Sequence, residues 1–330
     1  LKLVNMNDVA SLAGVSRGSV SNYINGKKTK AETQAKIKEA IAALDYVPNA
    51  MARALKTSKS NFVVFIVPTV NSPFFSELSY HMQQELQRHA YKMILCNSNN
   101  TSEEEIEYIQ MANAQKVAGL ITMSYANVAN LIDTSIPLVS IEKRVSQNVP
   151  LITSDNYMGG RLAGETLAKL GAKRLLFISK KPVKNISAVR ERGFLDYCQE
   201  NDIFADVFLA RKKINFISDF KRFVKDNFID QHFPYDGVFS DSDEYASDFY
   251  HILIQAGVQV PNQVQIIGFD GSRVYARQRI TLSSIKQSTA HIAKYAVEKL
   301  LLQIESKNER TFLGETTVIP VSFEKGITTK

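Results

Sequence analysis

The sequence predicts an α/β protein with a small all-α segment at its N-terminus. Beyond residue 60, continuous apolar runs alternate with amphipathic stretches, a pattern typical of parallel strands covered by helices on both faces. Residues 6–44 instead carry three helical patterns and no strand alternation. A chain of 330 residues is long enough for two or three domains, each with its own core.

The first two helical patterns lie in residues 8–26, DVASLAGVSRGSVSNYING. We expect the first helix over about residues 6–13, with Asn5 or Asn7 as its N-cap. Gly14 follows where a helix ends in a left-handed residue, which glycine adopts without steric cost. The chain therefore opens with a helix of only about two turns.

A second short helix should begin after Ser16, whose hydroxyl suits an N-cap, and run to about Ile24. Val20, Tyr23 and Ile24 follow one another at the spacing of a single apolar stripe. A third helix over residues 32–44 carries enough apolar residues to cover the first two.

Positive charge is concentrated in this N-terminal segment. Residues 1–60 contain ten lysines and arginines against four acids, which accounts for +6 of the formal net charge of +7. A positive end on a nearly neutral body indicates a polyanionic partner for that end.

The outward face of the second helix carries Arg17, Gly18, Ser21 and Asn22. Two short helices joined by a tight turn form a helix-turn-helix, whose second helix enters the major groove of DNA. Arginine pairs with guanine and asparagine with adenine through two hydrogen bonds each, and small residues permit close approach. The alternative is a helical hairpin with a merely solvated polar face.

The stretch DVASLAGVSRGSVSNYING, followed by YVPNAMARAL, resembles the DNA-binding head and hinge of the LacI/GalR family of bacterial repressors. The resemblance implies a helix-turn-helix domain over 1–47 and a hinge helix with linker over 48–60. Asn22 and Gln34 stand where many members have arginine, so we expect a different half-site sequence.

In that family the hinge helix pairs with the hinge helix of the second subunit and inserts a leucine into the minor groove. The resemblance implies that Leu55 is this leucine here, that Ala52 lies at the close contact and that Arg53 lies near phosphates. The residues to which the resemblance assigns DNA binding are Asn7, Ser16, Arg17, Gly18, Ser19, Ser21, Asn22, Asn25, Lys28, Tyr46, Asn49, Ala52, Arg53 and Leu55.

The body of the chain predicts two doubly wound parallel sheets, with a new start near residue 151. Ligands bind such sheets at the carboxyl ends of the strands. We expect strands at 62–67, 92–96, 119–123, 138–141, 175–179, 236–240 and 264–269, and helices near 74–89, 102–115, 157–170, 187–201, 217–228 and 243–256.

The body is also similar to the family's periplasmic-binding-protein-like core. The resemblance implies an N-subdomain over about 61–156 and 286–315, and a C-subdomain over about 157–285 and 316–330. The matching stretches are NSPFF (71–75), SDNYMGG (154–160), AVRERGF (188–194), IIGFDGS (266–272) and TLSSIKQ (281–287).

The resemblance places effector contacts in the loops at the strand ends. Carboxylates accept hydrogen bonds from hydroxyl groups, and arginine donates several N–H hydrogen bonds in one plane. An aromatic face packs against C–H bonds. Together these groups suit a sugar. The expected effector-binding residues are Asn71, Ser72, Phe74, Asp155, Arg190, Phe216, Ser242, Asp243 and Asp270.

Each assignment has a structural alternative. Asp155 could serve only as a helix N-cap, Phe216 only as core, Arg190 only in an ion pair and Asp270 only in a turn. A sugar phosphate is a further possibility for the effector, because Arg144 and Arg273 could reach the mouth of the cleft.

Enzymatic motifs are missing from the sequence. It has no HExxH, GxSxG, P-loop or GxGxxG motif, and its five histidines form no close metal-ligand pair. The acidic stretch SDSDEY (240–245) lacks the glycine and terminal glutamate of a calcium loop and predicts the start of a helix. We therefore expect no catalytic residues, metal or cofactor.

The chain has only two cysteines, Cys96 and Cys198, too few for a disulfide framework, and no apolar run of membrane-spanning length. Both cysteines are expected to pack as small apolar residues in a cytoplasmic protein. Because VIPVSFEKGITTK contains no leucine heptad, we expect a homodimer without a tetramerising tail.

The sequence thus favours a repressor that binds a pseudopalindromic operator and responds to a small sugar or sugar phosphate, possessing neither enzymatic activity nor a membrane partner. A solute-binding protein of a transporter would share the cleft but would have no use for a basic helix-turn-helix. A sugar-modifying enzyme would need a nucleophile or base in the cleft. The sequence leaves open whether the ligand releases the protein from DNA or strengthens binding.

Overall fold

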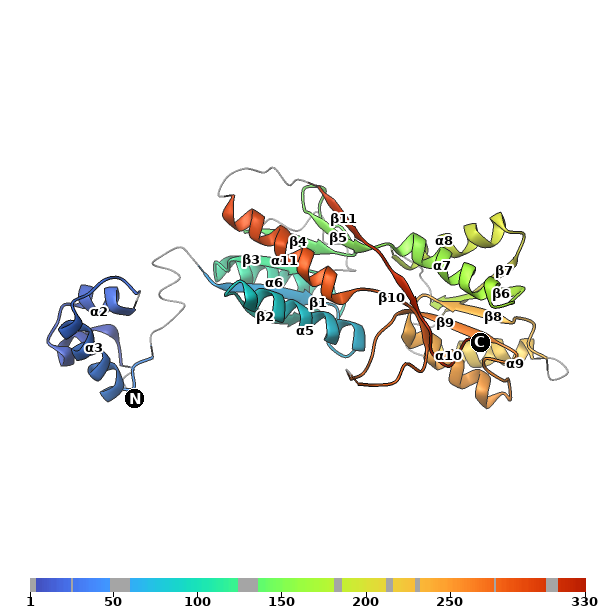
Figure 1. Cartoon of the computed structure of the whole chain (residues 1–330), viewed down its shortest axis with the longest axis horizontal. Helices are drawn as coiled ribbons and strands as arrows, with labels where there is room; N and C mark the ends of the chain where they lie inside the picture. The colour runs from blue at the N-terminus through green and yellow to red at the C-terminus, as the bar shows by residue number, and fades with distance from the viewer. Residues whose placement is uncertain are drawn as a thin grey trace. The chain divides into compact units, whose positions relative to one another are not determined.

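The structure, a computed structural model, describes residues 4–24, 26–47, 60–123, 136–180, 186–211, 216–228, 232–275, 277–306 and 314–330. The chain divides into two compact units, Leu1–Ser60 and Asn61–Lys330, which are treated separately below (Figure 1). Among the described residues, every helix is too short or too polar to cross a lipid bilayer.

The N-terminal unit, called the head below, contains α1 (Met6–Ala13), α2 (Arg17–Ile24) and α3 (Ala31–Ala43). The N-cap of α1 is Asn5, which forms a reciprocal capping box with Asp8. Gly14 ends α1 in the left-handed conformation at φ 62°. The bounds of the first two predicted helices are confirmed, and the third begins and ends one residue earlier than predicted.

The three helices enclose a small apolar core. Val9, Val20 and Ile37, one from each helix, are completely buried. Tyr23 and Ile24 pack against this core, as the predicted stripe requires. The opposite face of α2 therefore remains available to solvent.

The first sheet of the larger unit is parallel throughout, with strand order β11-β5-β4-β3-β1-β2. Its strands are β1 (Phe62–Val67), β2 (Lys92–Asn97), β3 (Gly119–Thr122), β4 (Leu138–Ile141), β5 (Leu151–Ser154) and β11 (Thr316–Ile319).

Helices cover both faces of this sheet. Alternate residues of β1 enter different cores, because Val63, Phe65 and Val67 face α5 (Pro73–Arg88) and α11 (Thr289–Glu305). Val64 and Ile66 face α6 (Ser102–Ala114) on the other side.

The second sheet has the order β12-β10-β9-β8-β6-β7 and is parallel except for β12, which runs antiparallel to β10. Its strands are β6 (Arg174–Lys180), β7 (Phe204–Ala210), β8 (Gly237–Ser240), β9 (Gln265–Asp270), β10 (Ser283–Lys286) and β12 (Ser322–Glu324). The predicted two-sheet α/β fold is confirmed.

Two helix pairs cover the second sheet. The first pair is α7 (Asn156–Lys169) and α8 (Ile186–Glu200), which share a core with Leu175 and Phe177. The second pair is α9 (Phe216–Asn227) and α10 (Asp243–Gln255), which pack on the opposite face. Cys96 and Cys198 are both buried and unbonded, as expected.

One predicted boundary is wrong. The sequence places residues 316–330 with the second half, but β11 pairs in parallel with β5 of the first sheet, and only β12 joins the second sheet. The chain therefore passes from the first sheet to the second between Ile319 and Ser322. The pairing of Thr316–Ile319 with Leu151–Ser154 decides the matter, because strand membership is fixed by backbone hydrogen bonds.

Candidate functional site

The exposed face of α2 is the first candidate site. Ser16 caps the helix, its Oγ accepting a hydrogen bond of 3.1 Å from the Ser19 N–H. Arg17, Gly18 and Asn22 lie exposed on the face opposite Val20, while Ser19 and Ser21 are half-buried. The helix thus presents an arginine and an asparagine with only small side chains between them.

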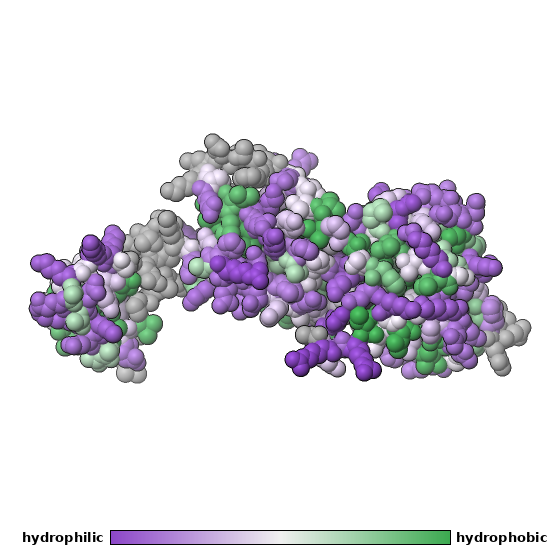
Figure 2. Space-filling model, in the orientation of Figure 1, coloured by the Kyte–Doolittle hydropathy of each residue, from purple (hydrophilic) through white to green (hydrophobic). Residues whose placement is uncertain are grey.

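Other predicted DNA-binding residues of the head surround this face or support it. Asn7 and Lys28 are exposed, and Tyr46 packs against the apolar core of the head. In the view of Figure 2, hydrophilic side chains cover most of the head. Five of the predicted residues lie outside the described residues: Asn25, Asn49, Ala52, Arg53 and Leu55.

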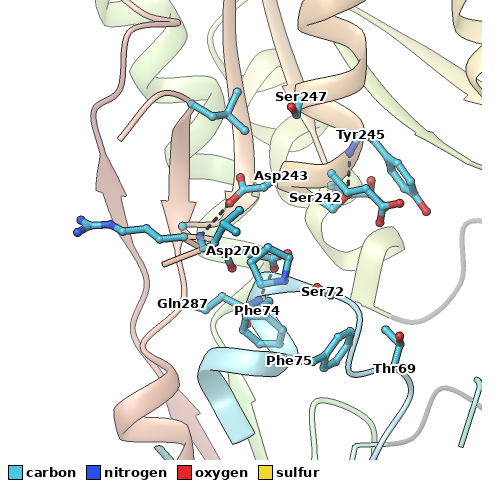
Figure 3. Close-up of a pocket in the computed structure, with 18 of the residues that line it drawn as sticks. Thr69, Ser72, Phe74, Phe75, Ser242, Asp243, Tyr245, Ser247, Asp270 and Gln287 are labelled. Carbon is cyan, nitrogen blue, oxygen red and sulfur yellow. Dashed lines mark hydrogen bonds between the residues drawn. The ribbon is translucent and has the colours of Figure 1, made fainter. Parts of the chain in front are cut away.

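The second candidate site is a cavity of about 1160 Å³ in the larger unit. It lies at the carboxyl ends of strands from both sheets, because its walls include segments that follow β1, β2, β8 and β9. Figure 3 shows Phe74 and Phe75 of α5 on one side of the cavity and Ser242 and Tyr245 on the other.

Seven of the nine predicted effector residues line this cavity: Asn71, Ser72, Phe74, Arg190, Ser242, Asp243 and Asp270. They come from segments almost 200 residues apart in the chain. Only the fold, with its two sheets, brings them together.

Arg190 is the buried cation of the cavity. Its Nε donates a hydrogen bond of 2.8 Å to Asn156 Oδ1, and one terminal nitrogen donates a bond of 2.7 Å to the main-chain oxygen of Asp241. The guanidinium lies 3.5 Å from the centre of the Phe269 ring. These contacts on three sides fix the plane of the guanidinium and the direction of its remaining donors.

A second layer of residues holds Arg190 in place. Asn156 donates a hydrogen bond of 2.8 Å to Glu142, a buried carboxylate that follows β4. Glu142 also accepts a bond of 2.8 Å from the Ser154 N–H at the end of β5. The orientation of Arg190 therefore depends on residues at the ends of first-sheet strands.

Asp270 ends β9 beside Arg190, with an oxygen 3.9 Å from the guanidinium. Gln287 donates a hydrogen bond of 2.7 Å to Asp270, and Ser154 donates one of 2.6 Å to Gln287. The backbone of Asp270 adopts φ 121°, a value rare for residues with a side chain, and such strain concentrates at functional sites.

Burial raises the pKa of Asp270 to about 7, although the charge of Arg190 lowers it. Burial and the charge of Asp270 also raise the pKa of Asp243. Asp243 accepts hydrogen bonds of 2.6 Å from the Ser284 hydroxyl and 3.0 Å from the Ser272 N–H. The cavity therefore contains carboxyl groups that are costly to ionise without a ligand.

Two predicted effector residues are not among those that line the cavity. Asp155 caps α7, its Oδ1 accepting a hydrogen bond of 3.1 Å from the Met158 N–H. The ring of Phe216 packs edge-to-face against Phe220 and Tyr245 in the core beside α9. These contacts are those of the structural alternatives, a helix N-cap for Asp155 and a core residue for Phe216.

The two arginines predicted at the mouth of the cleft are engaged elsewhere. Arg144 donates to the Val149 carbonyl and to the hydroxyl of Thr316, and it is absent from the cavity wall. Arg273 lines the cavity but forms an ion pair of 2.8 Å with Glu324. Arg144 therefore does not line the cavity, and the charge of Arg273 is paired with that of Glu324.

Sequence reasoning missed Lys180, Asp241, Tyr245 and Gln287, all of which line the cavity. Asp241 directly follows the strand DGVFS, so the rule that selected the other strand-end residues would have found it. The stretch SDSDEY starts a helix as predicted, since Ser242 caps α10. Among the described residues, no cluster of three histidine, cysteine or acidic side chains could hold a metal ion.

Comparison with known proteins places both sites in context. Residues 5–49 match the model of bacterial regulatory proteins of the lacI family, and residues 165–323 match that of the periplasmic binding protein-like domain. The sucrose operon repressor of Streptococcus mutans is 31% identical over 92% of this chain and 93% of its own. The ribose operon repressor of Halalkalibacterium halodurans is 29% identical over 99% of this chain and 98% of its own.

Solved structures agree on the fold. A periplasmic binding protein/LacI transcriptional regulator from Alkaliphilus metalliredigens, complexed with D-xylulofuranose, has a TM-score of 0.69 at 28% identity, covering 82% of this chain and all of its own. The lac repressor dimer bound to operator and the anti-inducer ONPF has a TM-score of 0.84 at 20% identity, covering 99% of each chain. With its helix-turn-helix head, its two-sheet core and these relatives, the chain belongs to the lacI family of bacterial regulatory proteins.

Proposed function

We propose that this chain is a transcriptional repressor of a carbohydrate-utilisation operon and that a neutral sugar bound in the cavity controls its affinity for operator DNA. The observation that carries the proposal is the cavity itself. It combines buried and half-buried carboxyl groups with one rigidly held guanidinium, at the carboxyl ends of strands from both sheets. Such groups pair with the hydroxyls of a sugar and would be left unpaired by an apolar ligand.

The charges favour a sugar over a sugar phosphate. The cavity wall carries five acidic and four basic side chains, and one of the basic ones, Arg273, is neutralised by Glu324. A phosphate dianion would raise further the cost of ionising the carboxyl groups around it, whereas the hydroxyls of a neutral sugar can bond to these groups in either protonation state. The D-xylulofuranose bound by the relative from Alkaliphilus metalliredigens supports an unphosphorylated sugar.

We assign DNA binding to the exposed face of α2, with Arg17 and Asn22 as the base-reading residues. Gly18 and Ser21 allow close approach to the groove, and Lys28 contacts the backbone. Leu55, with Ala52 and Arg53, acts at the minor groove, as the family resemblance implies.

The proposed assembly is a homodimer that places two heads on a pseudopalindromic operator. On the larger unit, β2 is an edge strand and carries exposed Leu95, while the neighbouring helix α5 carries exposed Tyr80. Exposed apolar residues beside an open sheet edge are typical of a surface that a partner covers. The proposed site of action is the bacterial cytoplasm, where the operator lies.

The cavity lies between elements of the two sheets, so a ligand that contacts both stabilises one relative arrangement of them. A ligand shifts DNA affinity only through its different affinities for the two arrangements. We propose that the sugar favours the arrangement that releases DNA. The carboxylates act as hydrogen-bond acceptors, and the proposal includes no chemical reaction of the sugar.

A thermal-shift screen against neutral sugars and their phosphates tests the ligand class. The chain contains no tryptophan, so the screen requires an extrinsic dye. A neutral sugar should raise the melting temperature, by mass action, while its phosphate does not. Stabilisation by phosphorylated sugars alone, or by neither class, would contradict the proposal.

A further inference from the structure

Glu142 is a buried residue outside the cavity wall. It directly follows Ile141, the last residue of β4, and is only 5% exposed. Its backbone adopts φ 62°, a left-handed conformation that is uncommon for residues with a side chain and persists only where the surrounding structure holds it. Its side chain accepts hydrogen bonds from the N–H of Ser154, the amide of Asn156 and the hydroxyl of Thr153. Because a carboxylate can only accept, it sets the direction of these donors.

The Asn156 amide connects this carboxylate to the guanidinium of Arg190. Its nitrogen donates hydrogen bonds of 2.8 Å to Glu142 and 2.9 Å to the main-chain oxygen of Ser154. Its oxygen accepts the bond of 2.8 Å from Arg190 Nε. A guanidinium can only donate, so the amide has one workable orientation between its two neighbours. Turned round, it would set two donors against each other at Arg190 and two acceptors at Glu142.

A second path of hydrogen bonds leads from Glu142 through the cavity wall to the same guanidinium. The Ser154 hydroxyl donates a bond of 2.6 Å to Gln287, and Gln287 donates one of 2.7 Å to Asp270 Oδ1 (Figure 3). The same oxygen lies 3.9 Å from the guanidinium of Arg190. The two paths form a closed network in which each donor faces an acceptor, so turning one member leaves another unpaired.

We propose that Glu142, although it does not line the cavity, is a positioning residue for sugar binding. Its carboxylate fixes the direction of the Asn156 amide, and the amide holds Arg190 so that its remaining N–H groups meet the hydroxyls of the sugar. The inference rests on the proposed function, because it needs a sugar in the cavity. It gives a role to a residue that the family resemblance does not place among the effector contacts.

An amide of the same shape at position 142 would break the network. In Glu142→Gln one acceptor becomes an NH₂ donor, which faces either the Ser154 N–H or the nitrogen of Asn156. If the Asn156 amide turns round to relieve this contact, its nitrogen faces Arg190 Nε, which is another donor. Each arrangement sets two buried donors against each other and displaces Arg190 or the residues that hold it.

The first test is isothermal titration calorimetry of the full chain with sucrose, D-ribose, D-fructose and D-xylulose. Glu142→Gln should raise the Kd of the sugar that binds the parent protein at least about tenfold. Asn156→Ala, which removes the amide itself, should cause a similar loss and replaces Glu142→Gln if that variant does not fold. The matched control is Thr153→Val, which removes a hydroxyl that donates to Glu142 from outside the closed network and should change the Kd less than about threefold.

A double-mutant cycle separates positioning of Arg190 from general support of the fold. Arg190→Lys keeps the positive charge but lacks the Nε–H that the Asn156 amide holds. In this background Glu142→Gln should change the Kd less than about threefold, because the group through which it acts is missing. Equal losses in the two backgrounds would overturn the inference.

A measurement without sugar keeps the inference separable from the proposed function. In the ligand-free protein with ¹⁵N-labelled arginine, the Nε–H signal of Arg190 is assigned by its loss in Arg190→Lys. Glu142→Gln should speed the exchange of this hydrogen with water at least about tenfold, and unchanged exchange would show that Glu142 does not hold Arg190. If the parent protein binds none of the four sugars, the proposed function fails and the role in sugar binding fails with it, whereas faster exchange would still show the hold on Arg190.

Discussion

Single side chains separate base reading from general DNA affinity in the head. Arg17 lies exposed at the start of α2, on the face opposite the buried Val20. Replacing Arg17 by alanine should weaken operator binding by about 1–3 kcal/mol and relax the preference at one base position. Fluorescence anisotropy measures the first effect, and selection of binding sites from a random library measures the second.

The control for Arg17→Ala is Lys28→Ala. An exposed lysine that contacts phosphates should weaken binding to all sequences about equally and make it less sensitive to salt. Recovery of an unchanged binding motif from the selection with Arg17→Ala would show that Arg17 does not read a base.

Asp270 makes the stability of the ligand-free protein depend on pH. Its pKa is about 7 in the folded protein against an ordinary value of 3.8, so the folded state holds a proton that the unfolded chain releases between these pH values. The stability that this proton contributes is complete below pH 3.8 and is lost as the pH rises to 7. At 1.36 kcal/mol per pKa unit, the loss amounts to at most about 4 kcal/mol.

Asp270→Asn removes this titration and keeps an oxygen that can accept from Gln287. We expect the variant to be more stable than the parent protein at pH 8, and its melting temperature to change less between pH 5 and pH 8. Urea unfolding at both pH values measures the stabilities, and thermal unfolding measures the melting temperatures. Parallel pH dependence in the two proteins would show that Asp270 is ionised at both.

At the scale of elements, the crossing of α7 and α8 positions Arg190. A Cβ atom added to Gly160 would lie 2.0 Å from the main-chain oxygen of Arg190 and 2.8 Å from the main-chain nitrogen of Phe194. The backbones of the two helices therefore approach each other at a distance that only glycine permits.

Gly160→Ala should force α7 and α8 apart, lower the free energy of unfolding by about 3 kcal/mol and weaken sugar binding through displacement of Arg190. Gly164→Ala, one turn further along α7, is the matched control, because its Cβ would meet only the side chains of Tyr197 and Phe194. Thermal unfolding and calorimetry of both variants provide the measurement. Equal losses in the two variants would argue against a special role for the crossing at Gly160.

The elements that the sequence predicts are those whose apolar residues form a continuous run or a helical stripe. All seven predicted strands exist, and so do the three helices predicted within residues 6–44 and the six predicted in the body, while the predicted hinge helix lies outside the described residues. Four of the five missed strands, β5, β10, β11 and β12, have only three or four residues, whereas the fifth, β7, is missed although its seven residues are mostly apolar. In β10, for example, Ser283 and Ser284 are buried with their hydroxyls bonded to Thr329 and Asp243, which lie 46 and 41 residues away in the chain.

The candidate site likewise contains residues that nearby sequence predicts and residues whose contacts depend on distant parts of the chain. The strand-end rule finds Asp270 and Ser242, since their positions depend on nearby sequence. Phe216, which the family resemblance assigned, packs instead against Phe220 and Tyr245, because an aromatic residue at the start of a helix suits a core as well as a cavity. The strand-end rule passes over Gln287, whose role depends on Ser154 of the first sheet and Asp270 of the second.

At the scale of the whole molecule, the uneven charge predicts how salt affects DNA binding. The first 60 residues carry +6 of the net charge of +7, so binding should release many condensed counterions. Raising the salt concentration from 50 to 200 mM should weaken binding to random duplex DNA about 100-fold or more. Anisotropy titrations over this range test the expectation, and a flat response would exclude the head as an electrostatic DNA-binding surface.

Control of transcription requires that a ligand in the cavity change the affinity of the head for operator DNA. The most direct measurement is the Kd of the full chain for its selected operator duplex at 150 mM salt, with and without the neutral sugar that raises its melting temperature. We predict that the sugar weakens operator binding at least tenfold, within the range typical of coupling between two sites. An operator Kd that is unchanged at saturating sugar would contradict the account.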